Sequence, residues 1–139
     1  MRSTRMAKDY AERASWVLKE AEGALVAANY AISVRRSQEA LELSAKAALR
    51  RLAIEYPHEH DVSEALEAAA DRLPDDVRRQ LEEIKALSAE LARIRGPALY
   101  GYEAEGVPAS EAFTTDYTSR MLDRVKPIVN LLVRFASQS

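Results

Sequence analysis

Apolar residues recur at intervals of three and four in five segments of the chain, which is the spacing of one face of an α-helix. The first predicted helix covers about residues 8–33. Its apolar stripe consists of Tyr10, Ala14, Val17, Ala21, Leu25 and Ala28. Trp16 lies beside this stripe, and we expect a side chain of this size to pack in the core, with an oligomer interface as the alternative.

A second helix is predicted over residues 37–56. The triplet Arg35-Arg36-Ser37 interrupts the first apolar pattern, and a serine at this point can cap a new helix. The apolar face of this helix consists of Leu41, Ala45, Ala48, Leu49 and Leu52. Pro57 ends it, because proline cannot continue the hydrogen-bond ladder of a helix.

Acidic residues mark the starts of the next two helices. Asp61 and Glu64 have the N-cap and N3 spacing of a capping box, which predicts a short third helix that ends near Arg72. Pro74-Asp75-Asp76 then starts a fourth helix. Its apolar positions are Val77, Leu81, Ile84, Leu87, Leu91 and Ile94. Gly96-Pro97 is expected to stop this helix just after Arg95.

The segment 96–109 is predicted to be a long irregular connection. It holds three of the four glycines and two of the five prolines, and long loops in compact domains are often functional. A last helix is predicted over about residues 110–136, with a kink at Pro127. Its apolar positions are Phe113, Tyr117, Met121, Val125, Ile128, Leu132 and Phe135. Five amphipathic helices with mostly short connections predict an all-α, antiparallel up-down bundle that forms one domain over residues 1–139.

Composition narrows the class of protein. Cysteine is absent, which excludes disulfides and thiolate chemistry and favours a cytoplasmic location. No apolar run approaches the roughly 20 residues that a membrane span requires, so we expect no membrane association. The N-terminus also lacks the apolar stretch of a signal peptide. Twenty basic residues stand against 22 acidic ones, a net charge of -2, which argues against a broad nucleic-acid-binding surface and leaves a local basic groove open.

Metal and acid–base chemistry find little support in the sequence. His58 and His60 supply at most half of a tetrahedral zinc site, and Asp61 beside them is already used as a helix cap. The acidic pairs Asp75-Asp76 and Glu82-Glu83 occupy helix starts and solvated faces, whereas catalytic carboxylates need a sheltered pocket. We therefore expect neither a metal site nor a cofactor.

The strongest candidate site lies where the fourth helix meets the long connection. Arg95 precedes the Gly-Pro turn, and Tyr100 and Tyr102 alternate in the sequence LYGYE. A guanidinium can hold a phosphate bidentately, while a phenol can stack on a base or donate a hydrogen bond. The alternative is structural: an arginine favoured by the helix dipole, and tyrosines that cover the end of the bundle.

At this point the chain resembles the HEPN family, small prokaryotic helical bundles often encoded beside a minimal nucleotidyltransferase. The likeness includes the segment YAERA at residues 10–14, SQEALELSAKAAL at 37–49 and HDV at 60–62, and it extends over nearly the whole chain. The family's best-known motif is an arginine followed after four residues by a histidine, with a tyrosine two positions later in toxin members. Arg95 and Tyr102 match the arginine and the tyrosine. Tyr100 stands at the histidine position, and Gly96 stands where the family favours Asn, Asp or His.

The resemblance implies a homodimer and, in active members, a metal-independent ribonuclease site formed across that dimer. There the histidine acts as acid and base and the arginine holds the phosphate. A phenol has a pKa of about 10, so Tyr100 could replace the shape of the histidine but not its proton transfer near neutral pH. We therefore predict no catalytic residue. The protein is expected to bind a nucleotide or RNA phosphate through Arg95, Tyr100 and Tyr102, as the partner of a minimal nucleotidyltransferase.

Two other functions remain open at this stage. One is a weak metal-independent endoribonuclease toxin of a toxin–antitoxin pair, and the other is a purely structural dimerisation module. The resemblance also marks Tyr102 as a modification site, since it matches the tyrosine to which nucleotidyltransferase partners of some toxins attach AMP. Gly101 and Gly106 are expected to give that loop the required flexibility.

Overall fold

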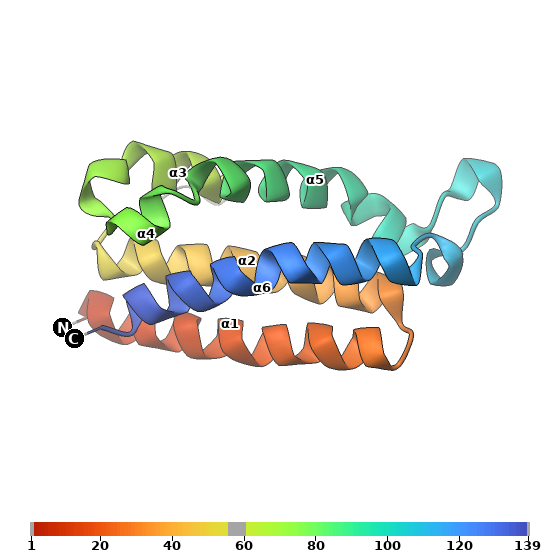
Figure 1. Cartoon of the computed structure of the whole chain (residues 1–139), viewed down its shortest axis with the longest axis horizontal. Helices are drawn as coiled ribbons and strands as arrows, with labels where there is room; N and C mark the ends of the chain where they lie inside the picture. Colours follow the sequence, from red (N-terminus) through yellow and green to blue (C-terminus); the bar gives the residue numbers. More distant parts are fainter. Residues whose placement is uncertain (1, 56–60, 139) are drawn as a thin grey trace.

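The computed structural model describes residues 2–55 and 61–138, and the regular structure of these residues is helical (Figure 1). Four long helices form the body of the bundle: α1 (Arg2–Val26), α2 (Tyr30–Arg51), α5 (Leu81–Tyr100) and α6 (Thr115–Ala136). Two short helices, α3 (Val62–Ala68) and α4 (Asp75–Arg78), lie between α2 and α5. Among the described residues, three 3-10 turns lie at Ala70–Arg72, Glu103–Glu105 and Ala109–Glu111. The predicted all-α, antiparallel bundle is confirmed.

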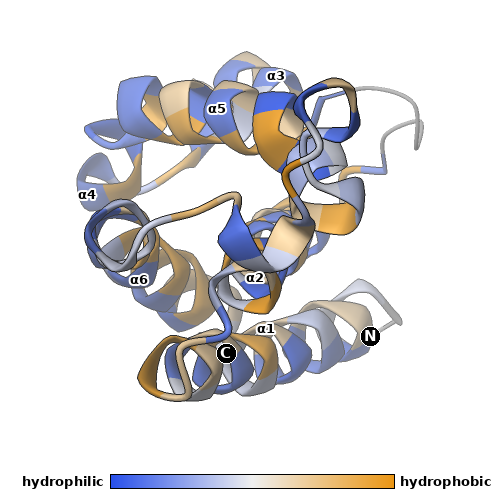
Figure 2. Ribbon diagram, turned by 90° about the vertical axis from the view of Figure 1, so that its right-hand side faces the viewer, coloured by the Kyte–Doolittle hydropathy of each residue, from blue (hydrophilic) through white to orange (hydrophobic). Residues whose placement is uncertain are grey.

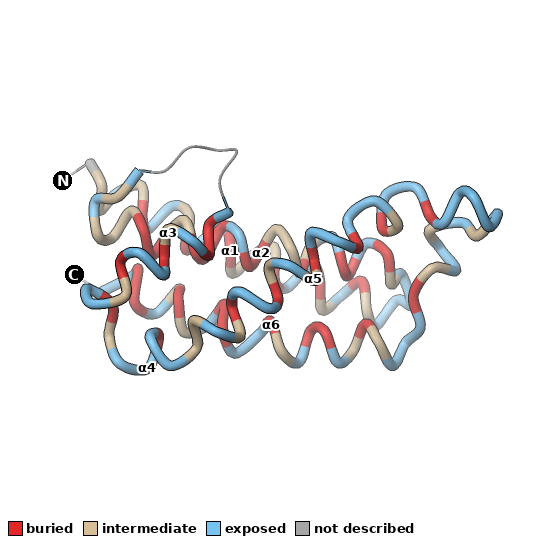
Figure 3. Tube along the Cα trace, turned by 90° about the horizontal axis from the view of Figure 1, so that it is seen from above, coloured by how far each residue is buried: buried red, intermediate tan, exposed pale blue. Residues whose placement is uncertain are grey.

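Helix α2 lies in the middle of the bundle. Viewed end-on, it is surrounded by α1, α6 and the layer that contains α3 and α5 (Figure 2). Buried positions recur along the inward faces of all the long helices (Figure 3). The largest fully buried side chains include Leu49, Leu66, Ile84, Leu87, Leu91, Met121 and Leu132. Each such side chain stabilises the fold by about 1.5–3 kcal/mol relative to an exposed one, so this interior holds the helices in place.

No helix among the described residues is both long and apolar enough to cross a membrane. This finding agrees with the absence of a long apolar run in the sequence.

The boundary between the first two helices was predicted wrongly. The chain turns at residues 27–29, where the Asn29 amide donates to the Ala24 carbonyl at 2.8 Å and Ala28 adopts a φ of 60°. Arg35-Arg36-Ser37 therefore lies inside α2. Ser37 is buried and caps nothing, because its hydroxyl donates to the carbonyl of Ser33 at 2.8 Å.

The predicted stop of the fourth helix after Arg95 is also wrong. Helix α5 continues through Gly96-Pro97 to Tyr100. A proline normally clashes with the side chain and backbone of the residue before it, and Gly96 has no Cβ to take part in that clash. The helix ends at Tyr100, and the next residue, Gly101, is its C-cap. The Gly101 amide donates to the Pro97 carbonyl at 2.8 Å.

The connection after α5 folds into a small hairpin that projects beyond the end of the bundle (Figure 1). Tyr102 and Val107 exchange two backbone hydrogen bonds, of 2.7 and 3.0 Å. Gly101 and Gly106 both have a positive φ, and a Cβ on Gly101 would lie only 2.2 Å from the Val107 carbonyl oxygen. These glycines are thus required by the turn geometry. The last helix begins at Thr115 instead of residue 110, because Thr114 caps it by accepting from the Tyr117 amide.

Two further expectations can be compared with the structure. Asp61 is the N-cap of α3, as predicted, and its carboxylate accepts a hydrogen bond from the Ser63 amide at 2.9 Å. Trp16 is not a core residue, because 62% of its surface is exposed. It lies on the outer face of α1, where the Lys19 ammonium is 4.8 Å from the centre of its ring.

Candidate functional site

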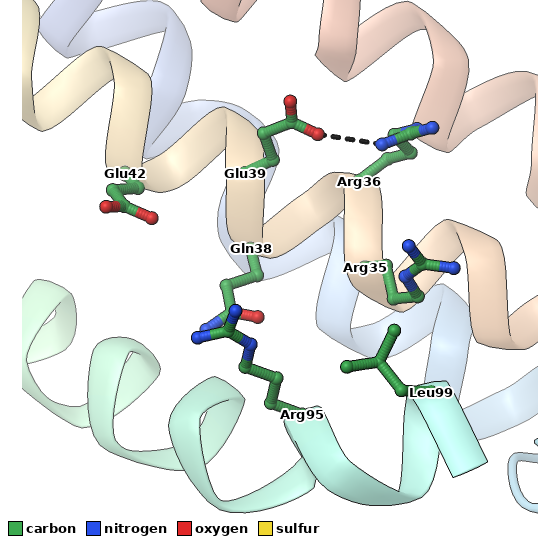
Figure 4. A pocket seen from close by; sticks show the side chains of 7 residues that line it. All are labelled: Arg35, Arg36, Gln38, Glu39, Glu42, Arg95 and Leu99. Atoms are coloured by element: carbon green, nitrogen blue, oxygen red, sulfur yellow. Dashed lines mark hydrogen bonds and ion pairs between the residues drawn. The ribbon is translucent and has the colours of Figure 1, made fainter.

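A groove of about 230 Å³ runs between α2 and α5. It is lined by Arg35, Arg36, Gln38, Glu39 and Glu42 of α2 and by Arg95 and Leu99 of α5. In the close view the Arg95 side chain reaches from α5 toward Gln38 on the opposite wall, and Arg35 lies above Leu99 (Figure 4). The groove therefore brings the predicted Arg95 together with polar residues of α2 that lie far from it in sequence.

The carboxylates of the groove are already paired. Glu39 accepts from the Arg36 guanidinium at 2.8 Å, and Arg36 also contacts Glu20 of α1 at 3.1 Å. Glu42 lies 3.4 Å from the Lys46 ammonium, one helical turn away on α2. Each carboxylate that lines this groove thus has a cationic partner.

Arg35 and Arg95 differ from the other charged residues of the groove. Within residues 2–55 and 61–138, neither guanidinium forms an ion pair, and both side chains are exposed. They extend from opposite walls, since one belongs to α2 and the other to α5. A pair of uncompensated guanidinium groups facing one groove is suited to an anion with several oxygen atoms, such as a phosphate.

Tyr100 does not line this groove. It is the last residue of α5, five positions after Arg95, and 67% of its surface is exposed. Because α5 stays helical through this segment, five residues correspond to a rotation of about 140° around the helix axis. Arg95 and Tyr100 of one chain therefore point to different sides of α5, whereas Leu99, four positions after Arg95, shares its face.

Tyr102 lies in the hairpin that follows α5, outside the groove lining. Its side chain is exposed, and its backbone is held to Val107 by the two hydrogen bonds described above. The structure thus places Arg95 in the groove and the two tyrosines at and beyond the end of α5, with the exposed Leu99 between these two regions.

Sequence reasoning did not single out Arg35 and Gln38, which line this groove. The sequence does contain a pattern that could have found them, because Arg35, Gln38, Glu39 and Glu42 recur at the spacing of one helix face. The predicted helix break at Arg35 concealed this polar face. Among the other candidates, His58 and His60 lie outside the described residues. The described residues contain no group of three His, Cys, Asp or Glu that could hold a metal ion. Asp75 and Asp76 are exposed in the first turn of α4.

A second polar cluster joins α5 to α6, away from the groove. The Arg124 guanidinium of α6 donates to Glu83 at 2.9 and 3.2 Å and to Glu90 at 3.0 Å. The Tyr117 hydroxyl donates to the other oxygen of Glu90 at 2.6 Å. This cluster fixes the position of α5, the helix that carries Arg95, against α6.

These contacts change the titration of the groups involved. The hydrogen bond from Tyr117, followed by that from Arg124, lowers the pKa of Glu90 even though burial opposes the shift. Burial and the hydrogen bond to Glu90 raise the pKa of Tyr117. Hydrogen bonds to Glu83 and Glu90 raise the pKa of Arg124. Tyr117 is thus a neutral donor and Glu90 an ionised acceptor across the physiological range.

Comparison with known proteins found one family model that covers most of the chain. The family model described as HEPN domain matches residues 7–135. No curated protein and no solved structure matches the chain.

Proposed function

The chain belongs to the HEPN domain family, and on that premise we propose that it is a homodimer of single-domain chains that binds the phosphate of a nucleotide or RNA. The α2–α5 groove is the proposed binding site, with Arg95 and Arg35 as the phosphate ligands. A minimal nucleotidyltransferase is the proposed partner protein. The observation that carries the binding proposal is the pair of uncompensated guanidinium groups on opposite walls of one groove.

The charge arrangement favours an anion over a neutral ligand. Arg36 is held by Glu20 and Glu39, so it stabilises the groove wall and stays in place. Arg35 and Arg95 can then approach the same phosphate from two sides without first breaking an ion pair. Gln38, which faces Arg95, has an amide that can both donate and accept hydrogen bonds and is suited to the sugar or the base.

Tyr100 and Tyr102 extend the proposed site beyond the groove. Leu99 lines the groove at the end of α5, and the two exposed phenols follow directly after it. A ligand longer than one phosphate, such as a short RNA, would have to pass around the end of α5 to stack a base on either ring, because Tyr100 and Arg95 point to different sides of the helix. Stacking on an aromatic side chain contributes about 1–3 kcal/mol per base. Tyr100→Ala should therefore weaken the binding of a short RNA and leave the binding of inorganic phosphate unchanged.

A thermal-shift screen tests the binding proposal. Inorganic phosphate, AMP, ATP and a short single-stranded RNA are compared on the unmutated protein and on Arg35→Ala, Arg95→Ala and Arg93→Ala. A ligand at about 100 times its Kd stabilises the folded state by about 2.7 kcal/mol. Losing one charge-assisted contact to phosphate should weaken binding roughly 10- to 100-fold, so Arg35→Ala and Arg95→Ala should lose about half of the shift or more.

Arg93→Ala is the matched control, because Arg93 is an exposed arginine of α5 that does not line the groove. Its ligand-induced shift should equal that of the unmutated protein. If all three variants responded alike, or if no phosphate compound shifted the unmutated protein, the binding proposal would be wrong. The purely structural dimerisation module would then be the better account.

A ribonuclease is the enzymatic alternative, and the position of Tyr100 speaks against it. No histidine occupies the acid–base position, and the helical continuation of α5 turns Tyr100 away from Arg95 of the same chain. We expect little or no RNA cleavage in EDTA. If the unmutated protein cut RNA and Arg95→Ala abolished the cutting, the toxin hypothesis would replace the binding proposal.

Tyr102 is retained as a proposed modification site for AMP. Its exposed phenol stands in a hairpin that projects from the bundle, where the active site of a partner protein could approach it. Co-expression with an adjacent nucleotidyltransferase, followed by peptide mass analysis, should find AMP on Tyr102 and none on Tyr102→Phe. An unmodified Tyr102 beside a partner that is active on ATP would count against this proposal.

A further inference from the structure

A second groove, of about 440 Å³, lies between the outer face of α1 and the end of α6. Its lining includes Lys8, Glu12, Ser15, Trp16 and Lys19 of α1 and Ser137 directly after α6. The two helix segments lie together at the end of the bundle that holds both termini (Figure 1). The groove shares no residue with the α2–α5 groove, so it is a separate candidate site.

Trp16 is the largest side chain in this groove and the only tryptophan of the chain. Most of its surface is exposed to solvent, which the packing of the bundle does not explain. Its neighbours in the lining, Ser15 and Ser137, are small, so the space beside the indole ring stays open. An exposed aromatic ring at an open groove provides a surface on which any nucleic-acid base can stack.

The acidic residues on the flanks of α1 are already paired with cations. Glu20 lies 3.1 Å from Arg36 of α2, and Glu22 lies 3.0 Å from Lys126 of α6. A further pair joins two residues of α1 to each other at 3.5 Å. The flanks are thus close to neutral, and the charges of the outer face determine its electrostatic potential.

This outer face carries three cations and one carboxylate. At about 100° per residue, five side chains lie within about 40° of one direction on the helix surface: Arg5, Lys8, Glu12, Trp16 and Lys19. The four charged ones are exposed, and within residues 2–55 and 61–138 none of them forms an ion pair. A basic strip that includes an aromatic ring, on a chain with a net charge of -2, is typical of a surface that binds a nucleic-acid backbone.

We infer that the outer face of α1 binds a single strand of RNA, with one base stacked on Trp16 and backbone phosphates held by Lys8 and Lys19. The two lysines are about 16 Å apart along the helix and Trp16 lies between them, so phosphates on both sides of the stacked base can contact an ammonium group. The Lys19 ammonium lies 4.8 Å from the centre of the indole ring, directly beside the stacking position. This site goes beyond the proposed function, because it needs no residue of the α2–α5 groove.

Glu12 makes this face selective for RNA over DNA. Its carboxylate lies between the two lysines along the helix, where it repels a phosphate and can accept a hydrogen bond from a ribose 2′-hydroxyl. DNA lacks that hydroxyl and gains nothing in return for the repulsion. A single strand is required, because the bases of a duplex are stacked on each other and cannot reach the indole ring.

The fluorescence of Trp16 reports binding at this face directly, since no other tryptophan contributes. An oligoadenylate RNA of about ten nucleotides should quench it, and the same sequence in DNA should bind more weakly. In anisotropy measurements with fluorescein-labelled RNA, Trp16→Leu should weaken binding roughly 5- to 150-fold, as expected for one stacked base. Lys8→Ala and Lys19→Ala should each reduce the slope of log affinity against log salt concentration by about 0.7.

Lys85→Ala is the matched control, because Lys85 is an exposed lysine of α5 that lines neither groove. Its affinity and salt slope should equal those of the unmutated protein, and circular dichroism verifies that each variant is folded. Glu12→Ala should bring the RNA and DNA affinities closer together. Equal affinities of the unmutated protein for RNA and DNA would overturn the assignment of RNA.

The double variant Arg35→Ala/Arg95→Ala separates this inference from the proposed function. It should show the same quenching of Trp16 by RNA as the unmutated protein. If the quenching were lost in the double variant, or if Trp16→Leu bound RNA as tightly as the unmutated protein, the inference would be wrong and phosphate binding in the α2–α5 groove would be unaffected. If RNA left Trp16 fluorescence unchanged, the inference would also be wrong, and a protein partner would be the better account of this face. Quenching by RNA in a protein that no phosphate compound stabilises through Arg35 and Arg95 would support the inference and overturn the proposed function.

Discussion

Replacing Arg124 with methionine removes the guanidinium that joins α5 to α6 while keeping most of the aliphatic stem. Three hydrogen bonds are lost, two to Glu83 at 2.9 and 3.2 Å and one to Glu90 at 3.0 Å. Glu90 keeps its hydrogen bond from the Tyr117 hydroxyl. The variant therefore measures how much the ionic part of this cluster contributes to the attachment of α5.

The exposure of the partners determines the expected magnitude. The side chains of Arg124 and Glu83 are 36% and 38% exposed, so solvent screens this pair and it should contribute about 0.5 kcal/mol. The side chain of Glu90 is only 21% exposed, and its charge-assisted bond should contribute about 1 kcal/mol. The sum, about 1.5 kcal/mol, corresponds to a fall in Tm of roughly 3–7 °C for a chain of this size.

Urea unfolding followed by circular dichroism measures this effect. The coupling energy between Arg124→Met and Glu90→Gln in a double-mutant cycle should exceed that between Arg124→Met and Glu83→Gln. Arg120→Met is the matched control, because Arg120 lies one turn earlier on α6 and pairs with Asp116 at an exposed position, where little stability is expected. If Arg124→Met left the free energy of unfolding unchanged, or if Arg120→Met had the same effect, the assigned role of the cluster would be refuted.

Three further predictions concern stability. Gly101→Ala should lower the free energy of unfolding by roughly 2 kcal/mol or more, because its Cβ would lie 2.2 Å from the Val107 carbonyl oxygen. Gly106→Ala, which meets no neighbour, should cost only about 1 kcal/mol, and equal effects in thermal unfolding would contradict this account. Because the pKa of Glu90 is lowered on folding, its contribution is present near neutral pH and is lost as the pH falls below about 4.5. The stability difference between the unmutated protein and Glu90→Gln should therefore shrink between about pH 6 and about pH 3, and a constant difference would refute the shift. Asp61→Ala should lower the free energy of unfolding by about 1 kcal/mol through loss of the α3 cap, and an unchanged urea midpoint would exclude that role.

The existence and order of the long helices followed from apolar periodicity, whereas several boundaries did not. Helix α2 ends at Arg51 and not near residue 56, and the predicted fourth helix is divided into α4 and α5. The turn between α1 and α2 uses Ala28 in a left-handed conformation, without the glycine or proline that usually marks such a turn. The break was therefore placed at the polar Arg35-Arg36-Ser37. In the structure these residues continue α2, and the buried hydroxyl of Ser37 is satisfied within the helix.

The end of α5 was misplaced for the opposite reason. Gly96-Pro97 is normally a strong stop, yet the glycine tolerates the following proline ring and the helix continues for one more turn. This error affected the candidate site. A loop after Arg95 would have allowed the Tyr100 side chain to lie beside the Arg95 guanidinium, whereas the helix directs the two side chains to different sides of α5.

The candidate site itself was predicted in part. Arg95 was identified from its residue type and position, and it lines the α2–α5 groove. Arg35 was not, because the pairing of α2 with α5 is a tertiary contact that periodicity within one helix does not reveal. Trp16 was correctly placed beside the apolar stripe of α1, but the general tendency of tryptophan to be buried was given more weight than that position.

The most direct test of the central claim is a crystal structure of the protein soaked with ATP and, separately, with AMP. We expect a phosphate group in the α2–α5 groove, within hydrogen-bond distance of the guanidinium groups of both Arg35 and Arg95, and no such group in crystals of Arg95→Ala. Nucleotide bound elsewhere on the molecule, with Arg35 and Arg95 free of any contact to it, would contradict the account.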